Sequence, residues 1–210
     1  MNTEIISAKD GAAVQRAVAI LASGGLVAFP TDTVYGVGAS PWDEQAVQRL
    51  YEVKERPLEL PIPLLLSDDD KVDRVAVLPE GCRDLPRHFW PGGLTLVAPK
   101  TDDVSATVSR RPTVAVRIPD NAWARALIRE AGGVLAVTSA NLSGEPSPRT
   151  AEDVKIQLGG RIRLIVDGGP SRLGVASSIV DCSVRPPRLL RRGAVREAEL
   201  RAVMGALDTA

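Results

Sequence analysis

The stretch LVAFPTDTVYGVGA, residues 26–39, decides the fold of this chain. Its first five residues form a short apolar run that ends in proline, which is typical of a buried strand. The hydroxyl-rich segment 30–36 follows directly, and Gly36-Val37-Gly38 after it is interpreted as a tight backbone turn. Because ligands of open α/β sheets collect at strand ends, this segment predicts one side of a binding site.

Helices and strands alternate on both sides of this stretch. Residues 12–23 and 44–54 have helical periodicity, with Asp10 and Asp43 expected as their N-caps. Further helices are predicted at 120–131 with Asp120 as cap, at 150–158 with a Thr150–Asp153 capping box, and at about 197–207. Apolar runs predict strands at residues 62–66, 94–99, 113–119, 134–140, 163–167, 177–181 and 187–191.

The spacing of these elements predicts an α/β layered fold. Several strands are too close together for helical crossovers, so we expect a mixed parallel and antiparallel sheet with flanking helices. The length of 210 residues is that of one domain, so we expect a single domain over residues 1–210.

Composition excludes several classes of protein. The chain is 44% hydrophobic and 25% charged, which is ordinary for a globular protein. Its 26 basic and 26 acidic residues leave no net charge for coating nucleic acid, and 3% aromatic residues argue against a stacking platform for single strands. Without a 20-residue apolar run or a secretory leader, we expect a cytoplasmic protein that does not enter membranes. Cys82 and Cys182 lack CxxC spacing and are expected to be separate buried thiols.

The residue inventory also excludes common catalytic machinery. The single histidine, His88, lies beside Phe89 and Trp90, where a packed or surface role is expected. With no second histidine, a Ser-His-Asp triad and a histidine-rich metal cluster are both hard to build. The P-loop pattern and the G-x-S-x-G elbow are absent.

Three hydroxyl-rich loops adjoin predicted strands, at residues 30–36, 138–144 and 174–178. Hydroxyls, backbone N–H groups and glycine suit a site for phosphate or carboxylate oxygens. Arg56, Arg117 and Arg191 are expected at strand ends near these loops. Each loop alone is typical of an ordinary turn, but the set favours an anion-binding crevice.

Six segments in order resemble the YrdC-like family, the L-threonylcarbamoyladenylate synthases. They are PTDTVYGVGA, KERP at 54–57, WPGGLTLV, TVAVRIP, TSANLSGEPSP and the DGG…SSIVD pair, and the resemblance runs from about residue 26 to 193. It implies a twisted mixed sheet with a concave, positively charged groove in the single-domain form of the family, with a motif-bearing core at about 11–193.

The resemblance implies that L-threonine, bicarbonate and ATP give threonylcarbamoyl-AMP and pyrophosphate, with Mg²⁺ assisting. A partner protein would then transfer the threonylcarbamoyl group to adenosine 37 of tRNA. No covalent intermediate is needed, so the protein has to neutralise charge and align the reactants.

The same resemblance assigns site residues. Catalytic Lys54 and Arg56 would hold phosphate oxygens, although a solvated basic helix end is the alternative for both. Threonine would contact Thr33, Arg117, Val137 and Ser177, with Arg117 on its carboxylate. The positions expected to contact ATP, beyond Lys54 and Arg56, are Thr113, Ser139, Asn141, Ser147 and Arg191; Ser139 and Asn141 could instead cap their turn.

Two positions depart from the family pattern, and two alternatives stay open. Leu60 stands where many members have an Asn that contacts ATP, and Leu65 where they have a His that contacts threonine. A paralogue that carbamoylates another amine is therefore one alternative. The other is a double-stranded RNA or ribosome-binding module, since residues 181–201 carry six Arg against three acids.

Overall fold

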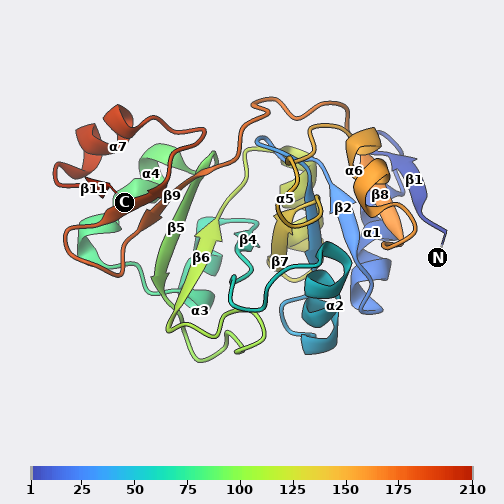
Figure 1. Ribbon diagram of the computed structural model, residues 1–210, viewed down its shortest axis with the longest axis horizontal. Helices are drawn as coiled ribbons and strands as arrows, with labels where there is room; N and C mark the ends of the chain where they lie inside the picture. Colours follow the sequence, from blue (N-terminus) through green and yellow to red (C-terminus); the bar gives the residue numbers. More distant parts are fainter. Residues whose placement is uncertain (1, 210) are drawn as a thin grey trace.

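Eleven strands form one sheet in the computed structural model, which describes residues 2–209 (Figure 1). The strand order is β1-β8-β2-β3-β7-β4-β6-β5-β9-β10-β11. The sheet contains parallel pairs such as β5–β9 and β4–β6 and antiparallel pairs such as β3–β7 and β5–β6. The expected mixed sheet with flanking helices is confirmed.

The strands are short and follow the apolar runs of the sequence. Their bounds are β1 Glu4–Ser7, β2 Val27–Phe29, β3 Gly36–Ala39, β4 Leu64–Leu66, β5 Leu94–Pro99, β6 Thr113–Arg117, β7 Val134–Ser139, β8 Leu164–Asp167, β9 Ser178–Asp181, β10 Arg188–Arg191 and β11 Asp208–Thr209. The helices are α1 Ala13–Ala22, α2 Glu44–Lys54, α3 Val72–Val75, α4 Leu85–Phe89, α5 Ala122–Glu130, α6 Ala151–Leu158 and α7 Glu197–Met204, with 3-10 turns at Asp69–Lys71 and Glu80–Cys82.

Strand alternation divides the apolar side chains between two cores. Leu64 and Leu66 of β4 pack into the larger core with α2 and α6, whereas Leu65 packs into the smaller core with α1 and α5. The helices α1 and α5 cover β2, β4, β7 and β8 on that second face. On the same face, no helix within residues 2–209 covers the side chains of β5, β6 and β9, which line a cavity. This open area positions the site.

The expected N-caps are observed in two helices, and two other helices have a different N-cap residue. Asp43 caps α2 by accepting from the Ala46 N–H at 3.0 Å, and Thr150 with Asp153 forms the expected capping box of α6. Asn121, one residue after Asp120, caps α5. Ala12 occupies the N-cap of α1, and Asp10 instead accepts from the Ala12 N–H.

The Gly36-Val37-Gly38 segment is a strand, so its interpretation as a tight turn is wrong. It forms β3 between β2 and β7. A side-chain carbon at Gly36 would lie 2.7 Å from Val137 Cγ1, so glycine is required by close packing on β7. The turn lies earlier, within the β2–β3 connection.

Cys82 and Cys182 form a disulfide, so the prediction of two separate thiols is also wrong. They lie 100 residues apart in sequence, but the parallel pairing of β5 with β9 brings the end of β9 over the 3-10 turn that holds Cys82. Spacing along the chain gave no indication of this proximity.

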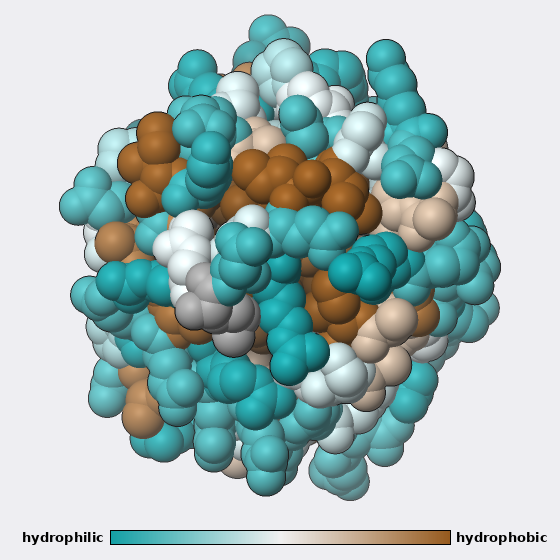
Figure 2. All heavy atoms as spheres, turned by 90° about the vertical axis from the view of Figure 1, so that its right-hand side faces the viewer, coloured by the Kyte–Doolittle hydropathy of each residue, from teal (hydrophilic) through white to brown (hydrophobic). Residues whose placement is uncertain are grey.

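The edge of the sheet at β1 is protected from pairing. Figure 2 shows this end of the molecule, where hydrophobic patches are interrupted by hydrophilic side chains. β1 has four residues, and its exposed Glu4 forms an ion pair with Arg16 at 2.8 Å. A short edge strand with charged side chains disfavours strand addition. No helix within residues 2–209 is long and apolar enough to cross a membrane.

Candidate active site

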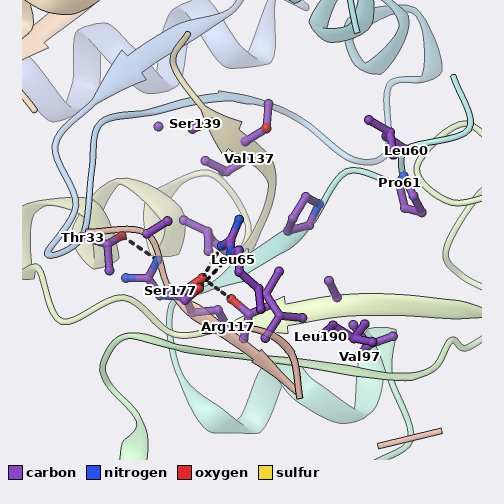
Figure 3. A pocket seen from close by; sticks show the side chains of 18 of the residues that line it. Thr33, Leu60, Pro61, Leu65, Val97, Arg117, Val137, Ser139, Ser177 and Leu190 are labelled. Carbon is purple, nitrogen blue, oxygen red and sulfur yellow. Dashed lines mark hydrogen bonds between the residues drawn. The ribbon is translucent and has the colours of Figure 1, made fainter. Parts of the chain in front are cut away.

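A cavity of about 440 Å³ lies on the open face of the sheet (Figure 3). Alternate residues of three neighbouring strands form its floor, since successive side chains of a strand point to opposite faces. The floor side chains are Thr95 and Val97 of β5, Thr113, Ala115 and Arg117 of β6, and Ile179 and Asp181 of β9. The intervening residues of the same strands are core.

Arg117 is fixed at one end of this floor by three acceptors. Its Nη1 donates to Thr33 Oγ1 at 2.8 Å, its Nε to the Gly92 carbonyl at 2.8 Å, and its Nη2 to Asp32 Oδ1. A guanidinium has five N–H donors, so one hydrogen on each terminal nitrogen is left for a ligand. Burial lowers the pKa of Arg117, and the adjacent carboxylate of Asp32 acts in the opposite direction.

Asp32 was missed by sequence reasoning. Its side chain is fully buried behind the cavity wall and also accepts from the Asp120 N–H at 3.1 Å. Its other oxygen, Oδ2, is buried without a hydrogen-bond partner within residues 2–209. Removing either member of a buried ion pair leaves an unpaired charge, so Asp32 keeps Arg117 in place.

Ser177 and Arg191 form the adjoining corner. Ser177 Oγ lies 2.8 Å from Thr95 Oγ1, and Arg191 Nη2 donates to it at 3.1 Å. Arg191 Nε donates to the Ser177 carbonyl at 3.0 Å. Gly193 permits this closeness, because a side-chain carbon there would lie 2.3 Å from the Ala176 carbonyl oxygen.

Lys54 lies behind the opposite wall and not on the cavity surface. It is 1% exposed, and its Nζ donates to the Ser139 carbonyl at 2.5 Å and to the Asn141 carbonyl. Burial lowers its pKa to about 7, and the nearby positive charge of Arg56 acts in the same direction. In this arrangement Lys54 supports the loop that presents Ser139 to the cavity.

Asn141 also supports this loop from behind. Its Nδ2 donates to the carbonyls of Leu142 at 2.7 Å and Glu145 at 2.8 Å. Together with Lys54 it orders the turn after β7. This corresponds to the alternative role expected for Asn141, which is to cap its turn.

Arg56 faces the cavity although Lys54, two residues earlier, does not. Glu55 between them ends α2 in the left-handed conformation, with φ of 52°, and so changes the direction of the chain. The guanidinium of Arg56 donates to the carbonyls of Leu60 at 3.1 Å and Pro61 at 2.9 Å. Burial lowers the pKa of Arg56.

Nine of the eleven predicted site residues line the cavity, and Lys54 and Asn141 do not. The nine are Thr33, Arg56, Thr113, Arg117, Val137, Ser139, Ser147, Ser177 and Arg191. Leu60 and Leu65, the two departures from the family pattern, line it as well. His88 lies on α4 with its Nδ1 against the Asp84 carbonyl, outside the cavity.

Further polar residues line the cavity and were missed, among them Thr31, Thr95, Asp181 and Arg111. Thr31 lies in the predicted loop at residues 30–36. Thr95 and Asp181 lie on predicted strands, where their side chains alternate with core residues, so strand periodicity was an available signal for these two. Arg111 lies in the loop before β6, where nothing in the sequence singles it out.

The residues present fit magnesium as an ion carried by ATP. Within residues 2–209 no group of three or more His, Cys, Asp or Glu side chains could hold a metal, and Asp181 is the single acidic residue lining the cavity. Mg²⁺ commonly keeps several waters and is held through substrate phosphates with one or two carboxylates. A resident metal cage is not formed by these residues.

Comparisons with known proteins agree on one family. The family model Sua5/YciO/YrdC, described as "Telomere recombination", matches residues 19–193. A threonylcarbamoyl-AMP synthase of Bacillus subtilis is 45% identical over 195 residues, which cover 91% of this chain and 56% of that protein. A putative threonylcarbamoyl-AMP synthase of Mycobacterium tuberculosis is 38% identical over 191 residues, covering 90% of this chain and 88% of that protein.

A solved structure is similar over the whole fold. The structure of P. abyssi Sua5 complexed with L-threonine superposes with a TM-score of 0.96 at 38% identity, covering 99% of this chain and 63% of that one. The chain thus spans a little over half the length of the Bacillus relative and less than two thirds of the Pyrococcus protein.

Proposed function

Because the chain belongs to the Sua5/YciO/YrdC family, we propose that it is a threonylcarbamoyl-AMP synthase that joins L-threonine, bicarbonate and ATP. One observation carries this proposal: Arg117, held by buried Asp32, faces a cavity that also contains Arg56, Ser139 and Arg191. A fixed site for a carboxylate therefore adjoins groups suited to phosphate oxygens.

The first part of the reaction is placed at the Arg117 end. The two free N–H groups of Arg117 bind the threonine carboxylate, and the hydroxyls of Thr33 and Ser177 lie beside them. The neutral amine forms an N–C bond with the bicarbonate carbon, and water is lost. A carbamate results, with no covalent bond to the protein.

The second part joins the carbamate to the nucleotide. A carbamate oxygen forms a bond to the α-phosphorus of ATP while the bond from that phosphorus to the pyrophosphate oxygen breaks. Arg56 and Ser139 provide donors for the departing phosphates. Mg²⁺ bound to the phosphates neutralises part of their charge.

In this proposal the protein acts in the cytoplasm, and its product serves tRNA modification. A partner protein transfers the threonylcarbamoyl group to adenosine 37 of tRNA. Direct binding of double-stranded RNA gains no support from the basic segment 181–201, because Arg192, Arg196 and Arg201 form ion pairs with Glu197 and Glu199.

Pyrophosphate release tests the proposal. The protein is incubated with Mg²⁺, ATP and bicarbonate, with and without L-threonine, and the product is identified by mass. We expect threonine-dependent pyrophosphate and threonylcarbamoyl-AMP, both strongly reduced in Arg117→Ala and unchanged in the surface variant Arg16→Ala. Pyrophosphate that forms equally without threonine would indicate plain ATP hydrolysis and refute the proposal; another amino acid that replaces threonine would support the paralogue.

A further inference from the structure

Asp181 is the one acidic residue lining the cavity within residues 2–209. It ends β9 and pairs in register with Val97 of β5, which in turn pairs with Ala115 of β6. No part of the reaction described above uses a carboxylate at this place. A carboxylate in a cavity that binds phosphates repels them unless the two groups lie apart.

The carboxylate of Asp181 is held in one orientation. Its Oδ1 accepts from the Ser183 N–H at 2.9 Å and from the Ser183 hydroxyl at 2.6 Å. Its Oδ2 has no hydrogen-bond donor within residues 2–209, and Arg188, its partner on β10, forms no ion pair with it there. One fixed oxygen is therefore free to accept from a ligand.

Apolar side chains line the cavity near Asp181 on the same face of the sheet. They are Val97, Ala115, Ile179 and Leu190, and Figure 3 shows Val97 and Leu190 next to each other at the side of the cavity away from Thr33. A flat aromatic ring can lie on such a surface. A carboxylate at its border can then accept from an N–H on the edge of the ring.

Two of the arginines that line the cavity are directed at other partners. The guanidinium of Arg191 is turned toward Ser177, and that of Arg56 lies against Leu60 and Pro61. Ser139 is on β7, four strands away from β9 in the sheet order, or roughly 19 Å at the usual strand spacing. The phosphates and Asp181 can thus occupy opposite sides of the cavity, which avoids repulsion between them.

We propose that Asp181 determines the choice of nucleotide base by accepting a hydrogen bond from the 6-amino group of adenine, with the ring lying on the neighbouring apolar side chains. The proposal rests on the proposed function and identifies the 6-amino group as the part of ATP that the site recognises. A 6-oxo purine presents an oxygen at that position, which faces the carboxylate without a proton between them.

The dimensions of the floor agree with this placement. Two residues along β6 and two strand spacings across the sheet put the Arg117 and Asp181 Cα atoms roughly 12 Å apart. Threonine on Arg117 and adenine on Asp181 therefore leave room for the carbamoyl, phosphate and ribose groups between them.

Nucleotide analogues test the proposal without depending on turnover. Binding of ATP, ITP and purine riboside triphosphate is measured by calorimetry in Mg²⁺, for the wild type, Asp181→Ala and Asp181→Asn. The Asn variant retains an oxygen that can accept from Ser183, so it preserves the local turn. Asp167→Ala is the matched control, because Asp167 also ends a strand and accepts from a backbone N–H two residues later, outside the cavity.

We expect the wild type to prefer ATP over both analogues, and Asp181→Ala to reduce that preference roughly 10- to 150-fold, as for a lost hydrogen bond to a charged group. Asp181→Asn, whose amide can donate to a 6-oxo group, should improve ITP binding, and Asp167→Ala should change nothing. An unchanged ratio of ATP to ITP affinity in both Asp181 variants would overturn the proposal. A raised Mg²⁺ requirement with that ratio unchanged would also overturn it, since it would indicate that Asp181 binds Mg²⁺ and not the base.

These outcomes are separable from failure of the proposed function. Base selectivity that depends on Asp181 but comes without threonine-dependent pyrophosphate would refute the synthase and leave this inference standing. Threonine-dependent pyrophosphate with equal use of ATP and ITP would do the reverse.

Discussion

The buried ammonium of Lys54 makes protein stability depend on pH in a direction that can be worked out from the structure. Lys54 has no carboxylate partner within residues 2–209; its Nζ contacts the carbonyl oxygens of Ser139 and Asn141. Burial lowers its pKa from the ordinary 10.5 to about 7 in the folded protein. In the unfolded chain the side chain is hydrated and keeps its ordinary value.

Between these two pKa values the unfolded state binds more protons than the folded state, so the free energy of unfolding rises with pH. Below pH 6 both states are protonated, and the penalty for burying the charge is fully present. Between pH 7 and 9 the folded state loses the proton and the unfolded state keeps it, which raises stability by about 2 kcal/mol at 1.36 kcal/mol per pH unit.

Urea denaturation of the wild type and Lys54→Met at pH 5, 6, 7, 8 and 9 measures this contribution. Other groups titrate in both proteins, so the difference between their free energies of unfolding isolates Lys54. We expect that difference to shift by about 2 kcal/mol in favour of the wild type between pH 7 and 9 and to stay level between pH 5 and 6.

A difference that stays level from pH 6 to 9 would refute the reasoning, because it would show that the carbonyl contacts hold the proton against burial. The chemical shift of the Lys54 ε-carbon, followed by NMR in the wild type alone, gives the same pKa if the Met variant does not fold.

Three further predictions concern substrates and stability. Arg56→Ala should raise the KM for ATP and Arg117→Ala the KM for threonine, each roughly 10- to 150-fold; steady-state titration of each substrate checks this, and a loss of ATP affinity alone in both variants would contradict the placement of Arg117. Leu60→Asn should lower the KM for ATP at unchanged melting temperature, since Leu60 is 43% exposed, whereas an unchanged KM would show that no ligand atom faces this position. Cys82→Ser should lower the free energy of unfolding by up to about 4.7 kcal/mol, because the disulfide closes a loop of about 100 residues; equal denaturation midpoints for this variant and the oxidised wild type would contradict it.

Elements specified by local chemistry were predictable from the sequence. Asp43 and the Thr150–Asp153 box cap their helices through side-chain contacts three residues away, and this pattern is visible in any window of the chain. The apolar run of β5 was predicted with its observed bounds. Where two adjacent residues can both cap, as at Asp120 and Asn121, the sequence does not distinguish them.

Features created by tertiary packing were not predictable. Gly36 forms part of a strand because Val137 of β7 lies against it, and that neighbour is about 100 residues away in sequence. Asp32 was read as part of a polar loop, yet it is the buried partner of Arg117 on another strand. Asp181 was assigned to the end of a strand, but it lines the cavity because no helix of the described residues 2–209 covers this face of β5 and β9.

The two buried cations of the site differ in what stabilises their charge, and this difference bears on their roles. Asp32 lies behind Arg117 and offsets its burial, so the guanidinium stays charged and can hold a carboxylate at any physiological pH. Within residues 2–209 the partners of Lys54 are carbonyl oxygens alone, and burial lowers its pKa to about 7, so its charge is lost near neutral pH. A permanent charge therefore faces the threonine end of the cavity, while the conditional charge lies behind Ser139. The loop that carries Ser139 is held most firmly when Lys54 is protonated, because an ammonium donates more strongly to carbonyl oxygens than a neutral amine does.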